Sequence, residues 1–201
     1  MIHELIQPVV VDLGAVPLPL TPESLFGSTR PFEVELGPGK GRFLQEWARL
    51  HPEVGILGVE RARKYAQRAA LRMVKHDVGT VRLAYTTAED LLFRCLAQAT
   101  VDAFHVYFPD PWPKHRHNKR RFFRSENVAR LATVLKPGGL LRVKTDHADY
   151  AEVIGEVLAH EALLERVDPA AAFEGVPATS FEIKYAVEAR PTHRFACRRI
   201  H

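Results

Sequence analysis

The sequence predicts an α/β protein with a doubly wound, mostly parallel sheet of seven strands, helices on both faces and a terminal antiparallel strand. Short apolar, strand-like segments alternate with longer amphipathic segments from residue 31 onward, as in βαβ units. A glycine-rich turn follows the first strand-like segment, where such sheets bind ligands. The last two strand-like segments lack this alternation, which favours an antiparallel strand at the end of the sheet.

The boundaries of the expected elements come from apolar periodicity and from glycine and proline positions. The segment 32–36 is β-like and stops at Gly37, and residues 136–139 predict a turn. Strands are expected at residues 32–36, 55–60, 81–85, 102–108, 140–144, 163–167 and 194–200. Helices are expected at residues 41–50, 62–75, 88–98, 119–135 and 148–160.

The chain is long enough for one domain with a proper core and short for two, at 201 residues. We expect residues 31–201 to form this domain and residues 1–30 to form an extended N-terminal arm that lies on it. Proline disfavours regular helices and sheets, and the arm contains Pro8, Pro17, Pro19 and Pro22.

The composition predicts a cytoplasmic protein that has no membrane segment and no metal site. It is 46% apolar and 26% charged, ordinary values for a globular protein. No segment approaches the roughly 20 apolar residues of a membrane-spanning helix, and the start of the chain lacks the features of a signal peptide. Cys95 and Cys197 stand far apart, so we expect two reduced thiols. The sequence leaves open whether the protein is a monomer or a homodimer.

Basic residues crowd one short stretch, although the formal net charge is only +4. A clustered basic stripe is typical of a protein that binds a polyanion. Runs of charge are as often plain solvated surface. The stretch contains Lys114, Arg116, Lys119, Arg120, Arg121 and Arg124, with His115 and His117 among them.

The turn after the first strand has the motif Glu35-Leu36-Gly37-Pro38-Gly39-Lys40-Gly41. Glycines there let the backbone turn tightly and approach a ligand, and Glu60 after the next strand suits hydrogen bonds to ribose hydroxyls. A dinucleotide site needs a glycine where Arg42 stands, and a phosphate-binding loop needs Ser or Thr after Lys40. An S-adenosylmethionine site fits better, with Glu35 facing the cationic end of the cofactor. A merely structural turn is the alternative.

The segment from Phe108 to Arg121 is the densest in functional residue types. Three prolines stiffen it, Asp110 and Trp112 stand at its head, and the cations follow. An aromatic ring can stack a base that has left its helix, while Lys and Arg bind phosphates. Trp112 could equally be a core aromatic and Asp110 a loop cap. The two histidines of the segment lack further ligands, so they predict no metal site.

Two further polar pairs follow the later strands. Thr145 and Asp146 close the fifth strand, where either could instead cap the next helix. Thr179 and Glu182 bring a hydroxyl and a carboxylate three residues apart, a spacing that a capping box explains equally well.

Together these segments resemble the bacterial tRNA (guanine-N7)-methyltransferase family. The glycine turn, Gly58-Val59-Glu60, residues 109–121, Thr145-Asp146 and the Thr179–Glu182 pair occur in the family's order and approximate spacing. The match runs from about Leu25 to Ile200, and its specific part is the Pro-Asp-Pro-Trp-Pro-Lys run. The resemblance implies a Rossmann-like enzyme that uses S-adenosylmethionine to methylate N7 of a guanine, usually in the variable loop of tRNA.

The resemblance also implies cofactor and substrate contacts for individual residues, and from the chemistry of the reaction we expect Asp110 and Asp146 to be the catalytic carboxylates. Where the family often has an acidic or amide residue for the adenine, this chain has Thr87 and Ala88, with Glu89 and Asp90 just beyond. The expected cofactor contacts are Glu35, Glu60, Thr87, Ala88 and Asp110, to which the glycine turn adds Gly37, Gly39 and Gly41. The expected substrate contacts are Lys114, Asp146, Thr179 and Glu182, to which the basic stretch adds Arg116, His117, Arg120 and Arg121.

The chemistry of the target defines what these residues must do. Guanine N7 is a lone-pair acceptor that carries no proton, so its methylation needs no base, and alignment and charge stabilisation supply the catalysis. We expect Asp146 to accept hydrogen bonds from guanine N1–H and the exocyclic amine, a role that Asp110 could share. Two rivals remain: a methyltransferase of the same fold that acts on a small molecule or a protein, and a non-catalytic RNA-binding module.

Overall fold

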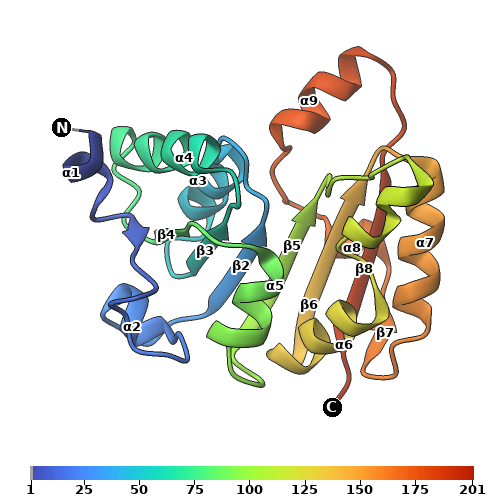
Figure 1. Cartoon of the computed structure of the whole chain (residues 1–201), viewed down its shortest axis with the longest axis horizontal. Helices are drawn as coiled ribbons and strands as arrows, with labels where there is room; N and C mark the ends of the chain where they lie inside the picture. The colour runs from blue at the N-terminus through green and yellow to red at the C-terminus, as the bar shows by residue number, and fades with distance from the viewer. Residues whose placement is uncertain (1) are drawn as a thin grey trace.

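The computed structural model describes residues 2–201, apart from the side chains of Ile2, His3 and His115. One sheet of eight strands has the order β1-β4-β3-β2-β5-β6-β8-β7 (Figure 1). All strand pairs are parallel except the two that β8 makes with β6 and β7. The strands are β1 (Val10–Val11), β2 (Phe32–Leu36), β3 (Gly55–Val59), β4 (Val81–Ala84), β5 (Val101–Tyr107), β6 (Leu135–Thr145), β7 (Leu164–Arg166) and β8 (His193–Arg199).

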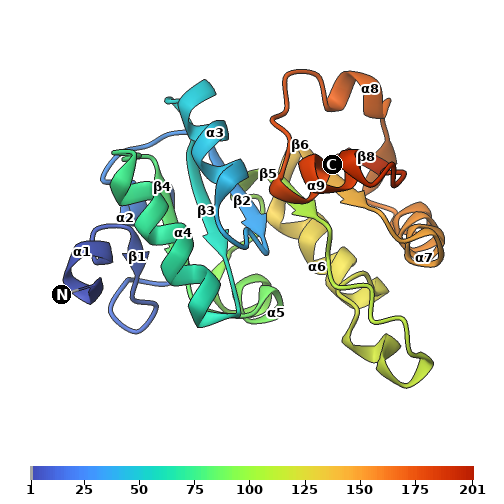
Figure 2. The same ribbon diagram turned by 90° about the horizontal axis from the view of Figure 1, so that it is seen from above.

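Helices cover both faces of this sheet (Figure 2). One face buries Trp47 and Met73 in a core cluster under α3 and α4, and the other buries Leu131 and Ile154 under α6 and α7. The α-helices are α1 (Ile2–Ile6), α2 (Pro22–Phe26), α3 (Arg42–Leu50), α4 (Arg63–Lys75), α5 (Ala88–Asp90), α6 (Ser125–Val134), α7 (Ala148–Ala159), α8 (Pro169–Ala172) and α9 (Ser180–Val187). A π-helix, η1 (Leu91–Cys95), continues α5, and η2 (His115–Arg120) is a 3-10 helix.

The first thirty residues differ from the extended arm that their prolines predict. They contain α1, β1 and α2, and β1 pairs with β4 at the edge of the sheet, which therefore has eight strands instead of seven. Pro22 lies in the first turn of α2, after the capping box that Thr21 forms with Ser24. Proline is tolerated there because the amide it lacks would have no helical partner. Leu20 and Leu25 are buried in the core, so tertiary burial holds this segment in place.

Two expected helices are also shorter than their patterns predict. The helix expected at 88–98 becomes a π-helix in its second half, where the carbonyls of Leu92 and Leu96 accept hydrogen bonds from Arg130. The helix expected at 119–135 begins only at Ser125, because Arg121 is extended and its Nε donates to the carbonyl of Pro111. In both places a contact distant in sequence outweighs local helix preference.

The topology identifies where a ligand would lie. From β2 the chain winds outward through β3 and β4 and then returns to β5 on the other side of β2. The crevice at such a switch point, beyond the carboxyl ends of the strands, is where open α/β sheets bind ligands. Figure 1 shows these strand ends at the upper edge of the sheet, beside α9. Among the described residues, no helix combines the length and the apolarity needed to cross a bilayer.

Candidate active site

A cavity of about 730 Å³ opens at the switch point, within the size range of sites for small molecules and cofactors. The carboxyl ends of β2, β3 and β5 and the loop after β4 form its floor and sides, and α9 contributes one wall. Its lining includes nine residues that the sequence singled out for the cofactor or the substrate: Glu35, Gly37, Gly39, Glu60, Thr87, Ala88, Asp110, Arg120 and Thr179.

The glycine turn needs its glycines for two different reasons. Gly37, Gly39 and Gly41 all have a positive φ, of 78°, 56° and 72°, a conformation that costs other residues free energy. A side chain on Gly37 or Gly39 would meet nothing within 4 Å, so a ligand has room to approach the backbone there. A Cβ on Gly41 would lie 2.9 Å from the Cβ of Ala69. Gly41 therefore faces α4 and allows this helix to pack against the turn. Gly41 does not face the cavity.

Glu60 holds the glycine turn in place. Its Oε2 accepts a hydrogen bond from the Gly39 amide at 3.1 Å and its Oε1 accepts one from the Ala62 amide at 2.8 Å. A carboxylate has about four lone-pair sites, so these two bonds leave acceptor capacity. Glu60 lines the cavity and can still receive hydroxyl groups of a ligand.

Glu35 is a buried carboxylate without a hydrogen-bond partner on Oε2 among the described residues. It is only 3% exposed. Burial, with the nearby Glu60 carboxylate as a second cause, raises the pKa of Glu35 well above its ordinary value of 4.5. An isolated buried carboxylate is costly, and a cationic group bound in the cavity would relieve that cost. Glu35 is therefore suited to the ammonium end of an amino-acid ligand.

The corner between β4 and α5 limits which residues can contact the adenine of a cofactor. Thr86, Thr87, Ala88 and Glu89 line the cavity, whereas Asp90 does not. The Thr87 hydroxyl caps α5 by accepting the Asp90 amide hydrogen bond, and it donates to the Asp90 carboxylate at 3.1 Å. The hydroxyl of Thr87 is thus engaged within the corner, which leaves backbone groups and the side chains of Thr86 and Glu89 to face a ligand.

Asp110 and Trp112 stand at the mouth of the cavity. The Asp110 carboxylate pairs with Arg61 at 2.7 Å, with both side chains more than half exposed. Trp112 has a positive φ of 42°, and the guanidinium groups of Arg61 and Arg120 lie 5.7 and 4.9 Å from its ring centre. Trp112 is therefore only partly buried and held among cations, unlike a core aromatic.

Within the basic segment (residues 114–121), some side chains are exposed and others contact neighbouring residues. Lys114 and Arg116 are exposed, and the ring of His117 packs edge-on against Trp112 at 5.7 Å. Arg121 is 8% exposed, donates to the Pro111 carbonyl at 2.7 Å and lies over the Tyr150 ring. Arg121 thus supports the loop from within, which differs from the exposed phosphate contact that the sequence predicted for it.

Thr179 and Glu182 form the capping box that their spacing allows, at the start of α9. The Glu182 carboxylate also lies 2.9 Å from Nζ of Lys144, a side chain of β6 that is only 2% exposed. The rings of Tyr107 and Phe173 flank the same ammonium at 4.8 and 4.9 Å. Lys144 is a residue that sequence reasoning missed, because a lysine in a strand carries no signal of its distant partner.

Asp146 lies apart from the cavity wall. Its carboxylate is 3.3 Å from Nη1 of Arg190, a residue that follows α9, and its side chain is 20% exposed. The Arg190 guanidinium also lies 4.9 Å from the ring centre of Tyr185. The expected guanine contact is therefore occupied by an ion pair in this structure. Among the residues described, no group of three or more His, Cys, Asp or Glu side chains is arranged to hold a metal ion.

Comparisons with known proteins agree with this geometry. The methyltransferase family model Methyltransf_4 matches residues 29–194. The tRNA (guanine-N(7)-)-methyltransferase of Thiobacillus denitrificans is 38% identical over 180 residues, which cover 88% of this chain and 74% of that protein. The Mycobacterium avium protein of the same name is 40% identical over 151 residues, 75% of this chain and 58% of its own length.

Solved structures support the fold. The 16S rRNA methyltransferase KamB superposes with a TM-score of 0.60 at 16% identity, over 89% of this chain and 91% of that chain. At this identity the similarity shows a shared methyltransferase fold.

This chain spans between 56% and 58% of the length of the first curated relatives it matches.

We predict that Glu35→Gln stabilises the ligand-free protein at neutral pH. Because the pKa of Glu35 is raised in the fold, the folded state keeps a proton that the unfolded chain releases near pH 4.5. Stability must then fall as pH rises from that value through the raised pKa. Urea unfolding from acidic to neutral pH should show a flatter profile for Glu35→Gln than for the wild type. The exposed Glu174 supplies a control, Glu174→Gln, which should follow the wild type, and identical profiles for all three proteins would contradict the prediction.

A second prediction concerns the attachment of α9. Glu182→Gln should cost about 2–3 kcal/mol, somewhat less than a typical broken buried ion pair because the amide oxygen still accepts from Lys144. Hydrogen exchange of the α9 amides and urea unfolding measure the effect. Lys184→Gln breaks the exposed pair with Glu188 on the same helix and should cost at most about 1 kcal/mol. Equal effects of the two variants would mean that the buried pair does not anchor the helix.

Proposed function

Because this chain belongs to the bacterial tRNA (guanine-N7)-methyltransferase family, we propose that it transfers a methyl group from S-adenosylmethionine to N7 of a guanine in tRNA. The observation that carries the proposal is a single cavity joining the glycine turn and the unpaired Glu35 carboxylate to Asp110, Trp112 and Arg120. We place the target guanine in the variable loop, following the family resemblance. We also propose that the protein is cytoplasmic and acts as a monomer or a homodimer.

The residues of the cavity fit S-adenosylmethionine on three counts. The buried Oε2 of Glu35 lacks a partner and suits the ammonium group. Glu60 retains acceptor capacity for ribose hydroxyls, and Gly37 and Gly39 leave open space beside the backbone. When bound, the cofactor supplies a sulfonium methyl group, an electrophile that a neutral lone pair can attack.

The mouth of the cavity suits a base with phosphates outside it. Trp112 offers an aromatic face on which a splayed-out guanine can stack. Arg120 lines the same mouth, and the exposed Lys114 and Arg116 follow on the basic segment. Cations at the rim would bind phosphates of the RNA backbone, which position the substrate without reading its sequence.

Catalysis by this chain consists of alignment and charge stabilisation, since N7 carries no proton to remove. The guanine ring becomes cationic as N7 is methylated, and carboxylates that accept its N–H groups bind more strongly at that stage. Asp110 lines the cavity and is well placed for this role. Asp146 can take part once Arg190 releases its carboxylate, and substrate phosphates are natural competitors for that guanidinium.

The test is methyl transfer from labelled S-adenosylmethionine to unmodified bulk tRNA, followed by nucleoside analysis of the product. We expect labelled 7-methylguanosine. If the protein binds the cofactor but labels no tRNA, the proposal fails, and a small-molecule or protein methyltransferase of the same fold becomes the better reading. If the protein binds tRNA but not the cofactor, a non-catalytic RNA-binding module becomes the better interpretation.

The same assay tests Asp146. We predict that Asp146→Asn lowers kcat/KM for tRNA by roughly ten- to a hundredfold, because a lost charge-assisted hydrogen bond costs about 1.5–3 kcal/mol. Arg190→Gln is the matched variant, since it frees the Asp146 carboxylate from its ion pair: it should leave kcat unchanged and raise only KM for tRNA, through the phosphate contact that Arg190 would otherwise make. Full turnover of Asp146→Asn, with unchanged selectivity for guanine, would remove Asp146 from the mechanism.

A further inference from the structure

Helix α4 carries five cations and no acidic residue. With 100° of rotation per residue, Lys64, Arg68, Arg72 and Lys75 fall within about 80° of the helix circumference. The opposite side of α4 is buried in the core through Ala66, Ala69, Ala70 and Met73. The cations therefore form a stripe that runs along the outer side of the helix.

The members of the stripe differ in how they are used. Arg72 is partly buried, where its guanidinium donates to the Lys40 carbonyl and to Gln45 and so supports the glycine turn. Lys64, Arg68 and Lys75 are exposed, and none of them forms an ion pair with an acidic side chain that the structure describes. We refer to these three residues as the α4 stripe.

A helix of this composition is unusual for plain solvated surface. Exposed helix faces commonly alternate the sign of their charges, and like charges four residues apart destabilise a helix by about 0.2–0.5 kcal/mol per pair. Lys64 and Arg68 are such a pair, and along the sequence the nearest acids to α4 are the buried Glu60 before it and Asp77 after it. Like charges held together at a cost indicate a polyanionic partner.

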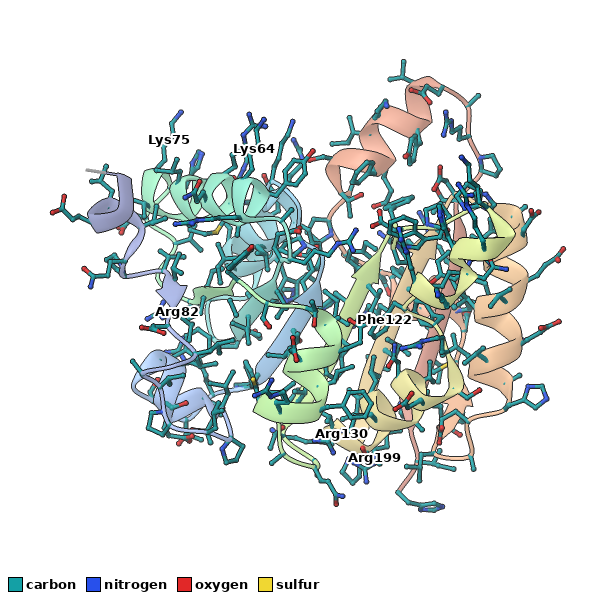
Figure 3. All side chains as sticks on the ribbon, viewed as in Figure 1. Lys64, Lys75, Arg82, Phe122, Arg130 and Arg199 are labelled. Atoms are coloured by element: carbon teal, nitrogen blue, oxygen red, sulfur yellow. The ribbon has the colours of Figure 1, made fainter. Side chains whose placement is uncertain are left out.

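The stripe continues from the rim of the cavity. Arg61 and Tyr65, at the start of α4, line the cavity on the side of β3, and Arg120 lines it from the basic segment after β5. Figure 3 shows Lys64 and Lys75 pointing outward from α4 at the upper edge of the molecule, the edge to which α9 belongs. The basic segment projects from the body on the other side (Figure 2). Two basic surfaces thus flank one opening.

The acidic surface of α7 restricts the direction from which a polyanion can approach. The helix α7, on the other face of the sheet, exposes Asp149, Glu152 and Glu156 and contains no cation. A nucleic acid would be repelled there and attracted to the edge that carries the cavity. Both surfaces around the cavity therefore suit the same partner.

We propose that the α4 stripe is a second RNA-binding surface, which holds the tRNA backbone on the β3–β4 side of the cavity while the basic segment holds it on the β5 side. This inference rests on the proposed function. The stripe is about 16 Å long, at 1.5 Å per helical residue, long enough to follow several phosphates of a backbone. Contacts on both sides fix the position of the RNA relative to the cavity, as phosphate contacts do in general.

The test compares two double variants that lose the same charge. Lys64→Gln/Arg68→Gln removes two cations of the α4 stripe, and Arg94→Gln/Arg198→Gln removes two exposed cations from outside the cavity wall. Binding of unmodified tRNA is measured at a series of salt concentrations. We expect the stripe variant to bind roughly tenfold or more weakly and to lose about 1.5–2 units of log–log salt slope, close to one unit per phosphate contact. The control should keep the wild-type slope.

The two proposals fail in different ways. Cofactor affinity and the melting temperature should match the wild type in both double variants, which separates a lost RNA contact from a damaged fold. If wild-type protein methylates tRNA and the two double variants show the same salt slope, the stripe contacts no phosphate. The inference about the α4 stripe is then wrong, while the proposed function stands. If wild-type protein binds the cofactor but forms no salt-sensitive complex with tRNA, the proposed function fails and the second surface fails with it.

Discussion

The cavity depends on one backbone constraint, the left-handed turn from Gly37 to Gly41 between β2 and α3. Positive φ values at three glycines reverse the chain within five residues, and the missing side chain of Gly41 lets Ala69 of α4 approach. Glu60 then ties the turn to the start of α4 through two backbone amides. The turn forms the floor of the cavity, where Oε2 of the buried Glu35 carboxylate has no hydrogen-bond partner among the described residues. A cationic ligand bound there would supply the partner that the Glu35 carboxylate lacks. The floor of the cavity is therefore a binding surface.

The opposite wall of the cavity, formed by α9, is held in place by side-chain contacts. α9 begins more than 130 residues after the glycine turn and meets the sheet through the buried pair of Lys144 and Glu182. Phe181 and Tyr185 of α9 pack against Phe108 at the end of β5, where a positive φ of 53° turns the chain toward the helix. One wall therefore rests on backbone geometry and the other on an ion pair and aromatic contacts. The second kind of attachment depends on a few side chains that lie far apart in the sequence.

The charges of the molecule are distributed in keeping with a nucleic-acid substrate. Cations of the glycine turn, the basic segment and α9 line the cavity, among them Lys40, Arg120 and Lys184, and the α4 stripe lies outside that lining, while the acids of α7 face elsewhere. Phosphate contacts of this kind supply affinity without sequence selectivity, so under the proposed function the base is selected by groups at the mouth of the cavity such as Asp110 and Trp112. Asp110 is held by Arg61 and Asp146 by Arg190. Each is an acceptor whose present partner is a guanidinium, a group that phosphates bind well.

The sequence by itself determined the sheet from β2 to β8, the glycine turn and most residues of the cavity floor, because these follow from local rules. Apolar periodicity, glycine at positive φ and an acid after a strand act within a few residues of one another. Only the tertiary structure decided the rest. β1 became an eighth strand because β4 offered it a free edge, and Arg121 turned inward because the Pro111 carbonyl and the Tyr150 ring engage its guanidinium there. Lys144 found Glu182 across 38 residues. Pairing and burial of this kind depend on which segments meet in space, and no local pattern encodes that meeting.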